Sequence, residues 1–365
     1  MQINILIPYK EMFDKEKTSS VSITVRNNLK YTEFKNHIKI YGKVVENPIS
    51  KKHFVPIKNP INPFKSKNKN LADLMCRYIL SSKDKNQIVE IHNRPYLQNY
   101  ILEKIPYAKI FLFFHNNPQD MKGSKSINER LKLLKNATLI VCVSNFIKEK
   151  FLDGLDFNSK KIIVLYNGVT RHIKKFPKKS KEVIFVGRIV KEKGVHLFVN
   201  TVERIANKFP EWKFTIIGSV LLGSNEKLSS FSKMIISKFE DISNQTYTTG
   251  FIDQKKVQRK MKTSSIIVIP SIWEEPFGLV AAEAMANGMA VIASSIGGIP
   301  EIINRNGILI KDIDEKKLQY FLTELMKDEK KLFDYQKKSW DNFNKDSKSS
   351  SKKLDSLRKR VLNYL

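Results

Sequence analysis

The stretch SIIVIPSIWEEPFGLVAAEAMANGMAVIAS, residues 265–294, decides the fold class of this chain. It begins and ends with short apolar runs, SIIVIP (265–270) and AVIAS (290–294), which are typical of buried strands. Between them, residues 277–287 are rich in alanine and other helix formers. Strands without polar alternation are typical of a parallel sheet covered by helices on both faces. The stretch therefore predicts a β–α–β unit.

The rest of the chain repeats this rhythm on either side of a polar, basic segment, NGVTRHIKKFPKKSK (167–181). In the first half we expect strands at 3–8, 88–92, 109–115, 139–144 and 162–166, and helices at 18–30, 71–82, 96–104, 126–136 and 145–153. In the second half we expect strands at 182–187, 213–218, 246–250, 265–270, 290–294 and 307–310, and helices at 194–209, 226–240, 253–262, 277–287 and 314–327.

This organisation predicts an α/β protein made of two Rossmann-like, doubly wound domains that face each other across a cleft. We expect an N-terminal domain at 1–168, a linker at 169–181, a second domain at 182–330 and a basic helical tail at 331–365. Ligands of such sheets bind outside the carboxyl ends of the strands, so the cleft is the expected active site.

The charge of the chain leaves several classes of partner open. The formal net charge is +29, and residues 1–170 carry 29 Lys and Arg against 14 Asp and Glu, about half of the excess. A basic protein can bind nucleic acid, an anionic membrane or a phosphorylated ligand, or can simply have a solvated basic surface. The even spread of charge argues against a nucleic-acid-binding tail or helix, and no zinc finger or helix-turn-helix signature is present.

The remaining bulk features favour a cytoplasmic protein. Cys76 and Cys142 lie in apolar runs, which indicates buried thiols in a reducing compartment. Residues 1–10, MQINILIPYK, lack the basic head and long apolar core of a signal peptide, and no apolar run is long enough to span a bilayer. We expect a cytoplasmic location, with peripheral contact at the inner face of the plasma membrane as an option.

Two acidic residues stand out in the stretch quoted first. Glu283 lies in an alanine-rich helix, where a carboxylate is costly unless something pairs with it. Glu275 precedes it by eight residues, about 12 Å along a helix, which is too far for a pair of glycosidase carboxylates. We therefore interpret both as hydroxyl-binding acids along one extended ligand. A salt bridge from Glu283 to a lysine across the cleft is the alternative.

Basic and backbone groups close to these acids favour a phosphate ligand. Arg188 and Lys193 lie in the loop that follows the strand at 182–187, where two cations can clamp a diphosphate. The backbone N–H groups of Phe277, Gly278 and Leu279 open the helix at 277–287, and a helix N-terminus attracts anions. A basic surface loop without a ligand is the alternative for Arg188 and Lys193.

Three motifs together carry a family resemblance. GRIVKEKG (187–194), EPFGLVAAEAMA (275–286) and GGIPEII (297–303) resemble the retaining glycosyltransferases of family 4, which have the GT-B architecture. They occur in the order found in that family. The resemblance covers roughly residues 165–310. HNRP (92–95) and FHNNPQDM (114–121) are similar to a bacterial branch that includes spore-coat and lipopolysaccharide glycosyltransferases.

The resemblance implies a role for each matching residue. Arg188 and Lys193 would bind the donor diphosphate and offset the charge of the leaving group. Glu275 would contact sugar hydroxyls near the anomeric carbon, and Glu283 would bind the ribose. The N–H groups of the segment Phe277, Gly278 and Leu279 would hold the distal phosphate. Gly250, Phe251 and Ile252 would cradle the base through their backbone.

In the first half, His115 would sit beside the transferred sugar, and a structural hydrogen bond at a strand end is its alternative. His92, Arg94 and Asn116 would lie on the acceptor or sugar side. Many family members have a Gly-Gly pair after the first strand, and here the nearest match is Thr18, Ser19 and Ser20. Ser19 and Ser20 are expected on the acceptor or sugar side, and binding of phosphate by this loop in place of the glycine pair is the alternative.

The resulting prediction is that the chain is a retaining, metal-independent glycosyltransferase without a cofactor. Its partners would be a nucleotide-diphosphate sugar, with UDP favoured, and a glycan or lipid-linked acceptor of the bacterial envelope. The segment DID (312–314) could be mistaken for a metal-binding motif but precedes a helix and is interpreted as an N-cap. The alternatives are a nucleic-acid-binding protein on a Rossmann-like scaffold and an inactive glycosyltransferase-like scaffold.

Overall fold

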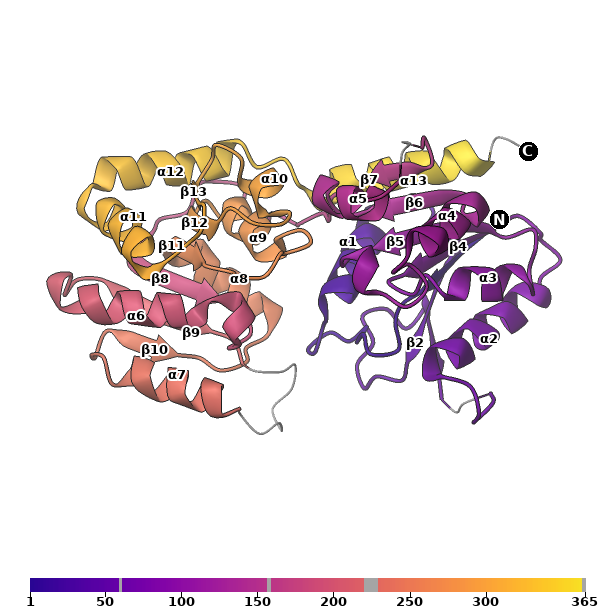
Figure 1. Cartoon of the computed structure of the whole chain (residues 1–365), viewed down its shortest axis with the longest axis horizontal. Helices are drawn as coiled ribbons and strands as arrows, with labels where there is room; N and C mark the ends of the chain where they lie inside the picture. Colours follow the sequence, from indigo (N-terminus) through magenta and orange to yellow (C-terminus); the bar gives the residue numbers. More distant parts are fainter. Residues whose placement is uncertain (59–60, 156–158, 220–228, 363–365) are drawn as a thin grey trace. The chain divides into compact units, whose positions relative to one another are not determined.

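The computed structural model describes residues 1–58, 61–155, 159–219 and 229–362. The chain divides into two compact units (Figure 1). Unit 1 consists of residues 1–168 together with the C-terminal stretch from Ser347, and unit 2 consists of Val169–Asp346. Each unit has its own parallel sheet and its own apolar core.

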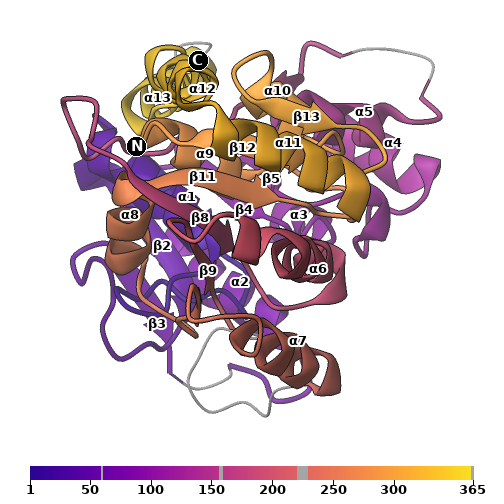
Figure 2. The ribbon, with the colours of Figure 1, turned by 90° about the vertical axis from the view of Figure 1, so that its left-hand side faces the viewer.

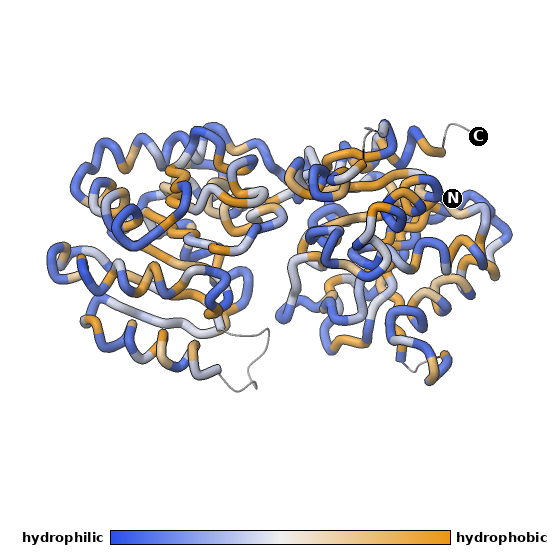
Figure 3. Tube along the Cα trace, in the orientation of Figure 1, coloured by the Kyte–Doolittle hydropathy of each residue, from blue (hydrophilic) through white to orange (hydrophobic). Residues whose placement is uncertain are grey.

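The sheet of unit 1 has seven parallel strands in the order β3-β2-β1-β4-β5-β6-β7. Their bounds are β1 Gln2–Leu6, β2 Ile38–Lys43, β3 Phe54–Ile57, β4 Gln87–His92, β5 Lys109–Phe114, β6 Leu139–Cys142 and β7 Ile162–Val164. Strands β4 and β6 are buried at every position; β6 is wholly apolar, whereas β4 also carries the buried Glu90. Figure 3 shows the hydrophobic residues of the chain gathered along such strands.

Within the described residues, six α-helices pack around this sheet. Their bounds are α1 Ser20–Tyr31, α2 Lys67–Leu80, α3 Leu97–Leu102, α4 Ile127–Asn136, α5 Asn145–Leu152 and α13 Ser347–Leu362. Helix α1 packs against α13, whereas α2 packs against α3 and α3 against α4. Short 3₁₀ turns lie at Lys35–His37 and Pro118–Asp120.

Helix α13 belongs to the core of unit 1 although it lies at the far end of the sequence. Leu354 is part of the same apolar cluster as the residues of β1 and α1. Arg358, 1% exposed, lies 2.7 Å from the Glu90 carboxylate on β4 and 3.0 Å from Asp355. Thr32 at the end of α1 donates to Asp355. A buried ionic network therefore fastens α13 to the sheet.

The sheet of unit 2 has six parallel strands in the order β10-β9-β8-β11-β12-β13. Their bounds are β8 Ser180–Val186, β9 Lys213–Ile217, β10 Thr246–Thr248, β11 Ser264–Ile269, β12 Ala290–Ser294 and β13 Ile308–Ile310. The α-helices are α6 Val195–Ile205, α7 Ser230–Glu240, α8 Gln254–Thr263, α9 Leu279–Ala286, α10 Ile299–Ile303, α11 Glu315–Lys327 and α12 Glu329–Asp341. Two 3₁₀ turns lie at Lys191–Lys193 and Ala206–Lys208. Figure 2 shows α11, α6 and α7 one below the other.

The fold class expected from the sequence is confirmed: both sheets are parallel and helices connect most of their strands. Two strands were missed. β2 includes an exposed Lys39 and a glycine, which interrupt its apolar pattern. β3 contains Pro56, which is tolerated because β3 is the edge strand of its sheet. Helix α2 also begins at Lys67 rather than 71, with the Ser66 side chain capping its first turn.

The expected linker and tail differ from the structure. Residues 169–181 belong to unit 2, and Lys179 donates to the backbone carbonyls of Met261, Lys262 and Asn287 at the ends of α8 and α9. The segment 331–365 is not one tail, because α12 covers unit 2 and α13 returns to unit 1. The amphipathic pattern of a helix predicts that one face is buried, but it does not predict which unit covers that face.

Candidate active site

The polar residues expected in unit 2 lie in the loops that follow its strands. Because all six strands are parallel, these loops lie at one edge of the sheet, the carboxyl edge. Strand β8 lies between β9 and β11, so the strand order changes direction between β8 and β11. Ligands of doubly wound sheets bind at such a switch point. The loops after β8 and β11 are therefore the centre of the candidate site.

These two loops are joined through their backbones. Gly194 has a φ of +66°, and a Cβ at this position would overlap the carbonyl oxygen of Pro270 and lie 2.7 Å from its carbon. The backbone N–H of Ile272 and the Ser271 hydroxyl both donate to the carbonyl oxygen of Glu192, at 3.0 and 3.1 Å. Glycine is required here by both its φ and the close approach. The contact fixes Lys193 relative to the loop after β11.

The structure brings Lys193 and Glu275 together. Their side chains form an ion pair, and the Ser271 hydroxyl donates to the same carboxylate oxygen at 3.2 Å. The Lys193 ammonium also lies 5.3 Å from the ring centre of Trp273. Arg188 lies in the same loop as Lys193, and its side chain is exposed. Both cations expected in this loop therefore stand at the switch point, one held by a carboxylate.

The Gly297-Gly298 pair explains part of the third motif. The backbone N–H of Gly298 donates to the Glu275 carbonyl at 2.7 Å. A Cβ on Gly297 would lie 2.6 Å from the Glu275 backbone nitrogen, and one on Gly298 would lie 2.6 Å from the Pro276 carbonyl oxygen. The two glycines let the loop after β12 support the backbone of the acidic loop. This supporting role was not predicted from the sequence.

Helix α9 begins directly after the acidic loop. Gly278 has a φ of +89° and is the N-cap of this helix, which starts at Leu279. The N–H groups of its first turn have no carbonyl partner within the helix and point toward the carboxyl edge. Phe277 before it is buried. The local structure is thus a strand, a turn and a helix N-terminus, an arrangement that suits anions.

The partner of the buried Glu283 includes an amide group. Glu283 is 6% exposed, and the side chain of Gln254 at the start of α8 donates to its carboxylate at 2.5 Å. A carboxylate has about four acceptor positions, so several donors can share it. A ligand, with a lysine across the cleft as the alternative, was the partner expected from the sequence; a glutamine on the neighbouring helix was not predicted.

The segment Gly250–Ile252 lies at the same edge, after β10. Gly250 has a φ of +61°, is exposed, and accepts a hydrogen bond from the Gly218 backbone N–H at 3.1 Å. Phe251 is exposed and Ile252 is half-buried. The Asp253 side chain then caps α8. Gly218 in turn packs on Gly187 at the end of β8, which links this segment to the basic loop.

In unit 1 the structure pairs two histidines that the sequence treated separately. His92 Nδ1 and His115 Nε2 are hydrogen-bonded at 2.8 Å, and the His92 ring stacks on Phe113. Burial lowers the pKa of His115 to about 4, and burial followed by the nearby His115 and Arg358 lowers the pKa of His92. Both rings are therefore neutral at pH 7, and one donates its N–H to the other.

The loops around this pair contain the remaining expected residues. Asn93, with a φ of +51°, accepts the backbone N–H of His115 at 2.7 Å. Arg94 donates to the Asn93 carbonyl at 2.6 Å, and Asn116 is exposed in the loop after β5. All of these residues lie at the carboxyl edge of the unit 1 sheet.

Sequence reasoning missed Glu11. Its carboxylate accepts the hydroxyl of Ser19 and lies against the backbone N–H groups of Val21 and Ser22 in the first turn of α1. Burial raises the pKa of Glu11, and these hydrogen bonds and Arg94 oppose that shift. Ser19 is buried and Ser20 exposed. A carboxylate thus occupies the N-terminus of α1, where a bound phosphate would meet like charge.

The described part of the chain has neither a metal-binding cluster nor a membrane-spanning helix. No group of three or more His, Cys, Asp or Glu residues is placed to hold a metal ion. No helix there is long and apolar enough to cross a membrane. Asp314 belongs to the DID segment (312–314). It caps α11 by accepting the Lys317 N–H at 2.8 Å, as predicted.

Comparison with known proteins gives a family similarity for unit 2. Residues 168–340 match the family model of glycosyl transferases group 1, which covers nearly all of unit 2. The chain is 27% identical over 323 residues to spore coat protein SA of Bacillus subtilis, covering 77% of this chain and 82% of the relative. It is 23% identical over 242 residues to lipopolysaccharide 1,2-N-acetylglucosaminetransferase of Salmonella typhimurium, covering 62% and 60%.

Among solved structures, the chain matches HepE of Anabaena in complex with UDP and glucose, with a TM-score of 0.75 and 15% identity, over 98% of this chain and 99% of that one. The fold is therefore the GT-B architecture of glycosyltransferases. Within that fold, unit 2 has the sequence pattern of glycosyl transferases group 1, and the relatives support glycosyltransferase activity.

Proposed function

We propose that this chain is a retaining glycosyltransferase that moves a sugar from a UDP-sugar to a glycan or lipid-linked acceptor during envelope polysaccharide or lipopolysaccharide synthesis. The observation that carries the proposal is the meeting of Lys193 and Glu275 at the switch point of unit 2. A cation, an acid and a helix N-terminus at one sheet edge suit a ligand that has both phosphates and hydroxyls.

The donor diphosphate would take the Lys193 ammonium and the exposed Arg188 guanidinium. These cations would offset the charge that develops on the leaving UDP. The N–H groups of Gly278 and Leu279 would hold the distal phosphate. Glu275, released from its ion pair, would accept hydroxyls of the sugar, and Glu283 would accept those of the ribose. The base would lie on the backbone of Gly250, Phe251 and Ile252.

Retention would follow from attack on the same face that the leaving phosphate departs from. The departing phosphate oxygen would take the proton of the acceptor hydroxyl, so no protein nucleophile is required. The neutral His115 would contribute a hydrogen bond to the sugar rather than a charge. We propose that no metal ion takes part. The names of the Bacillus and Salmonella relatives suggest the envelope as the source of the acceptor.

A thermal-shift panel with UDP, GDP, ADP, CMP and poly-U RNA tests the donor class. A ligand that binds only the folded chain at 100 times its Kd adds about 2.7 kcal/mol to the free energy of unfolding. We expect UDP to raise the melting temperature of wild type and to lose this effect in Arg188→Ala. A salt-sensitive response to RNA without any response to nucleotides would instead favour a nucleic-acid-binding protein.

Two product assays test the finer statements. Proton NMR of the product formed from a UDP-α-sugar should show the α-anomer, whereas the β-anomer would refute retention. Turnover should be equal with and without EDTA. An active chain that stops on chelation and recovers with a divalent cation would refute metal independence.

A further inference from the structure

One loop of unit 1 exposes a large apolar ring next to a concentration of lysines. Phe64 lies between β3 and α2, and its side chain is 97% exposed. The surrounding sequence, residues 58–72, contains four lysines and no acidic residue. Exposed aromatic residues are ordinary when they are scattered, but an apolar tip within a basic segment is the composition of a membrane-surface anchor.

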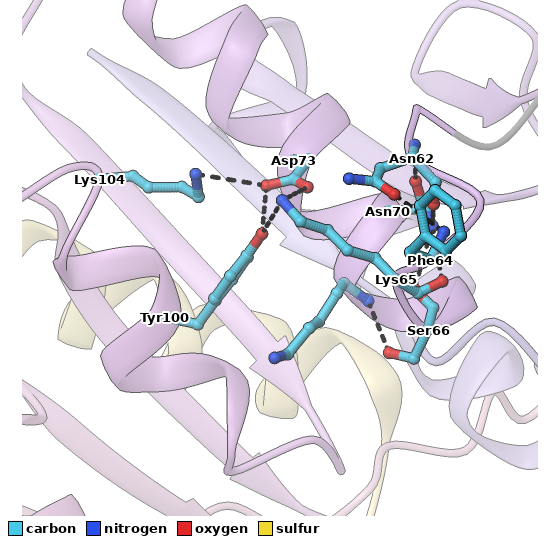
Figure 4. A network of polar contacts seen from close by, with 9 residues as sticks. Asn62, Phe64, Lys65, Ser66, Asn70, Asp73, Tyr100 and Lys104 are labelled. Atoms are coloured by element: carbon cyan, nitrogen blue, oxygen red, sulfur yellow. Dashed lines mark hydrogen bonds and ion pairs between the residues drawn. The ribbon is translucent and has the colours of Figure 1, made fainter.

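The exposure of Phe64 is imposed by the loop around it. Asn70, 2% exposed on α2, donates to the carbonyls of Asn62 and Lys65 at 2.9 and 3.0 Å and accepts the Asn62 N–H at 2.7 Å. The Asn62 side chain accepts the N–H of Phe64 at 2.8 Å. Figure 4 shows these contacts beside the free ring. The backbone on both sides of Phe64 is therefore fixed while its ring stays in water.

Three ammonium groups surround a tyrosine near this loop. Lys65, Lys69 and Lys104, here called the lysine cluster, lie 5.2 to 5.5 Å from the ring centre of Tyr100. Within the described residues, the carboxylate that pairs with these lysines is Asp73, which lies 2.8 Å from Lys65 and 3.6 Å from Lys104 (Figure 4). The Tyr100 hydroxyl also donates to Asp73, at 2.6 Å. Because one carboxylate faces three ammonium groups, the lysine cluster keeps a net positive charge.

A fourth lysine connects this surface to the candidate site edge. The Lys67 ammonium lies 5.1 Å from the ring centre of Tyr9, and the Tyr9 backbone N–H donates to the Asn68 side chain at 2.8 Å. Tyr9 lies in the loop after β1, and the Phe64 loop follows β3. Since the strands are parallel, both loops lie at the carboxyl edge, where His92 and His115 also lie.

We propose that the loop at residues 61–69 docks unit 1 on an anionic membrane. The Phe64 ring enters the boundary between headgroups and acyl chains, while Lys67 and the lysine cluster face the anionic headgroups. Docking in this way places the carboxyl edge of unit 1 at the lipid surface. The identity of the acceptor as lipid-linked rests on the proposed function, but docking itself requires no transfer activity.

Vesicle sedimentation tests the docking surface. We expect the full chain to bind vesicles of phosphatidylcholine with about one-third phosphatidylglycerol, and to bind pure phosphatidylcholine at least about tenfold more weakly. Phe64→Ser should weaken binding to the anionic vesicles about tenfold. Lys67→Gln/Lys69→Gln should weaken it about twentyfold and reduce its dependence on salt.

Matched variants in unit 2 separate this surface from general charge. Tyr320→Ser removes another exposed aromatic ring, and Lys316→Gln/Lys327→Gln removes the same charge from the surface of α11. Both should bind vesicles as wild type does. Equal losses in the two charge variants, or none in Phe64→Ser, would refute docking through this loop. Circular dichroism should show that every variant is folded.

A fluorescent label tests entry of the loop directly. Cys76 and Cys142 are buried, so a Phe64→Cys variant can be labelled at position 64 with an environment-sensitive dye. Anionic vesicles should raise and blue-shift its emission, whereas a label at Tyr320→Cys should not change. An unchanged signal at position 64 during vesicle binding, or displacement of the bound protein by poly-U RNA alone, would overturn the proposal. UDP binding is read separately, so a failed transferase would leave this result intact.

Discussion

The carbonyl group of Pro270 occupies the space in which residue 194 would carry a side chain. Gly194 is the N-cap of α6 after the basic loop, and Pro270 directly follows β11 before the acidic loop. The absence of one Cβ therefore sets how closely Lys193 approaches Glu275. A position that looks like an ordinary helix start is a spacer between two halves of the candidate site.

Gly194→Ala should be strongly destabilising, and Gly250→Ala is its control. Both positions have a positive φ, at +66° and +61°, so alanine costs about 1–2 kcal/mol at each from backbone strain. At Gly250 no atom lies within 4 Å of the added Cβ, whereas at Gly194 it collides with Pro270. Urea unfolding should therefore show a clearly larger loss for Gly194→Ala, together with weaker UDP binding. Equal losses would contradict the close contact.

Substitutions in the Lys193–Glu275 pair should separate binding from turnover. Lys193→Met removes a charge-assisted contact to the donor diphosphate and should raise the Kd for UDP by about 10- to 100-fold. Glu275→Gln frees Lys193 from its internal partner, so UDP should bind at least as tightly while kcat falls. Isothermal titration calorimetry and a transfer assay measure the two effects. Weaker UDP binding by Glu275→Gln would place Glu275 at the phosphates instead of the sugar.

The paired histidines should make the chain less stable in acid. Both pKa values are lower in the folded state than the ordinary 6.5, so the unfolded chain binds more protons between about pH 6.5 and 4. The free energy of unfolding should therefore fall as pH falls through this window, by up to about 3 kcal/mol for His115. His115→Gln should flatten this pH dependence, and Ser20→Ala, without a titratable group, should leave it unchanged. A wild-type stability that is flat over this range would show that the rings are not held neutral.

The buried ion pair of Arg358 and Glu90 should contribute more to the free energy of unfolding than the exposed ion pair of Lys359 and Glu33. Arg358→Met leaves the Glu90 carboxylate buried without its cation and should cost about 3–5 kcal/mol. Lys359→Gln breaks an ion pair with Glu33 in which both side chains are about half-exposed, and should cost at most about 1 kcal/mol. Adding Glu90→Gln to Arg358→Met should recover part of the loss. If the double variant is no more stable than the single one, the cost lies in packing and not in charge.

The sequence predicted the positions of strands and helices better than it predicted which of them lie next to one another. Strands such as β8 and β11 could be placed within two residues because their apolar runs are continuous, and the motifs identified the loops that follow them. Strand order cannot be derived from apolar periodicity, so the hydrogen bond between His92, at the end of β4, and His115, directly after the adjacent strand β5, was not foreseen. Glu11 was missed for a related reason: an acid in a polar loop gives no sign that its side chain folds back onto a helix N-terminus.

The return of α13 to unit 1 has a consequence for the nascent chain. Unit 2 is an insertion between Gly168 and Ser347, so a ribosome releases all of its residues before those that complete unit 1. Until then Glu90 lacks the arginine that neutralises it, because Arg358 follows it by 268 positions in the sequence. Unit 2 can fold while the earlier-made unit still lacks α13, which packs against α1. The half made first is thus finished last, and its exposure to chaperones and proteases lasts for the synthesis of the other.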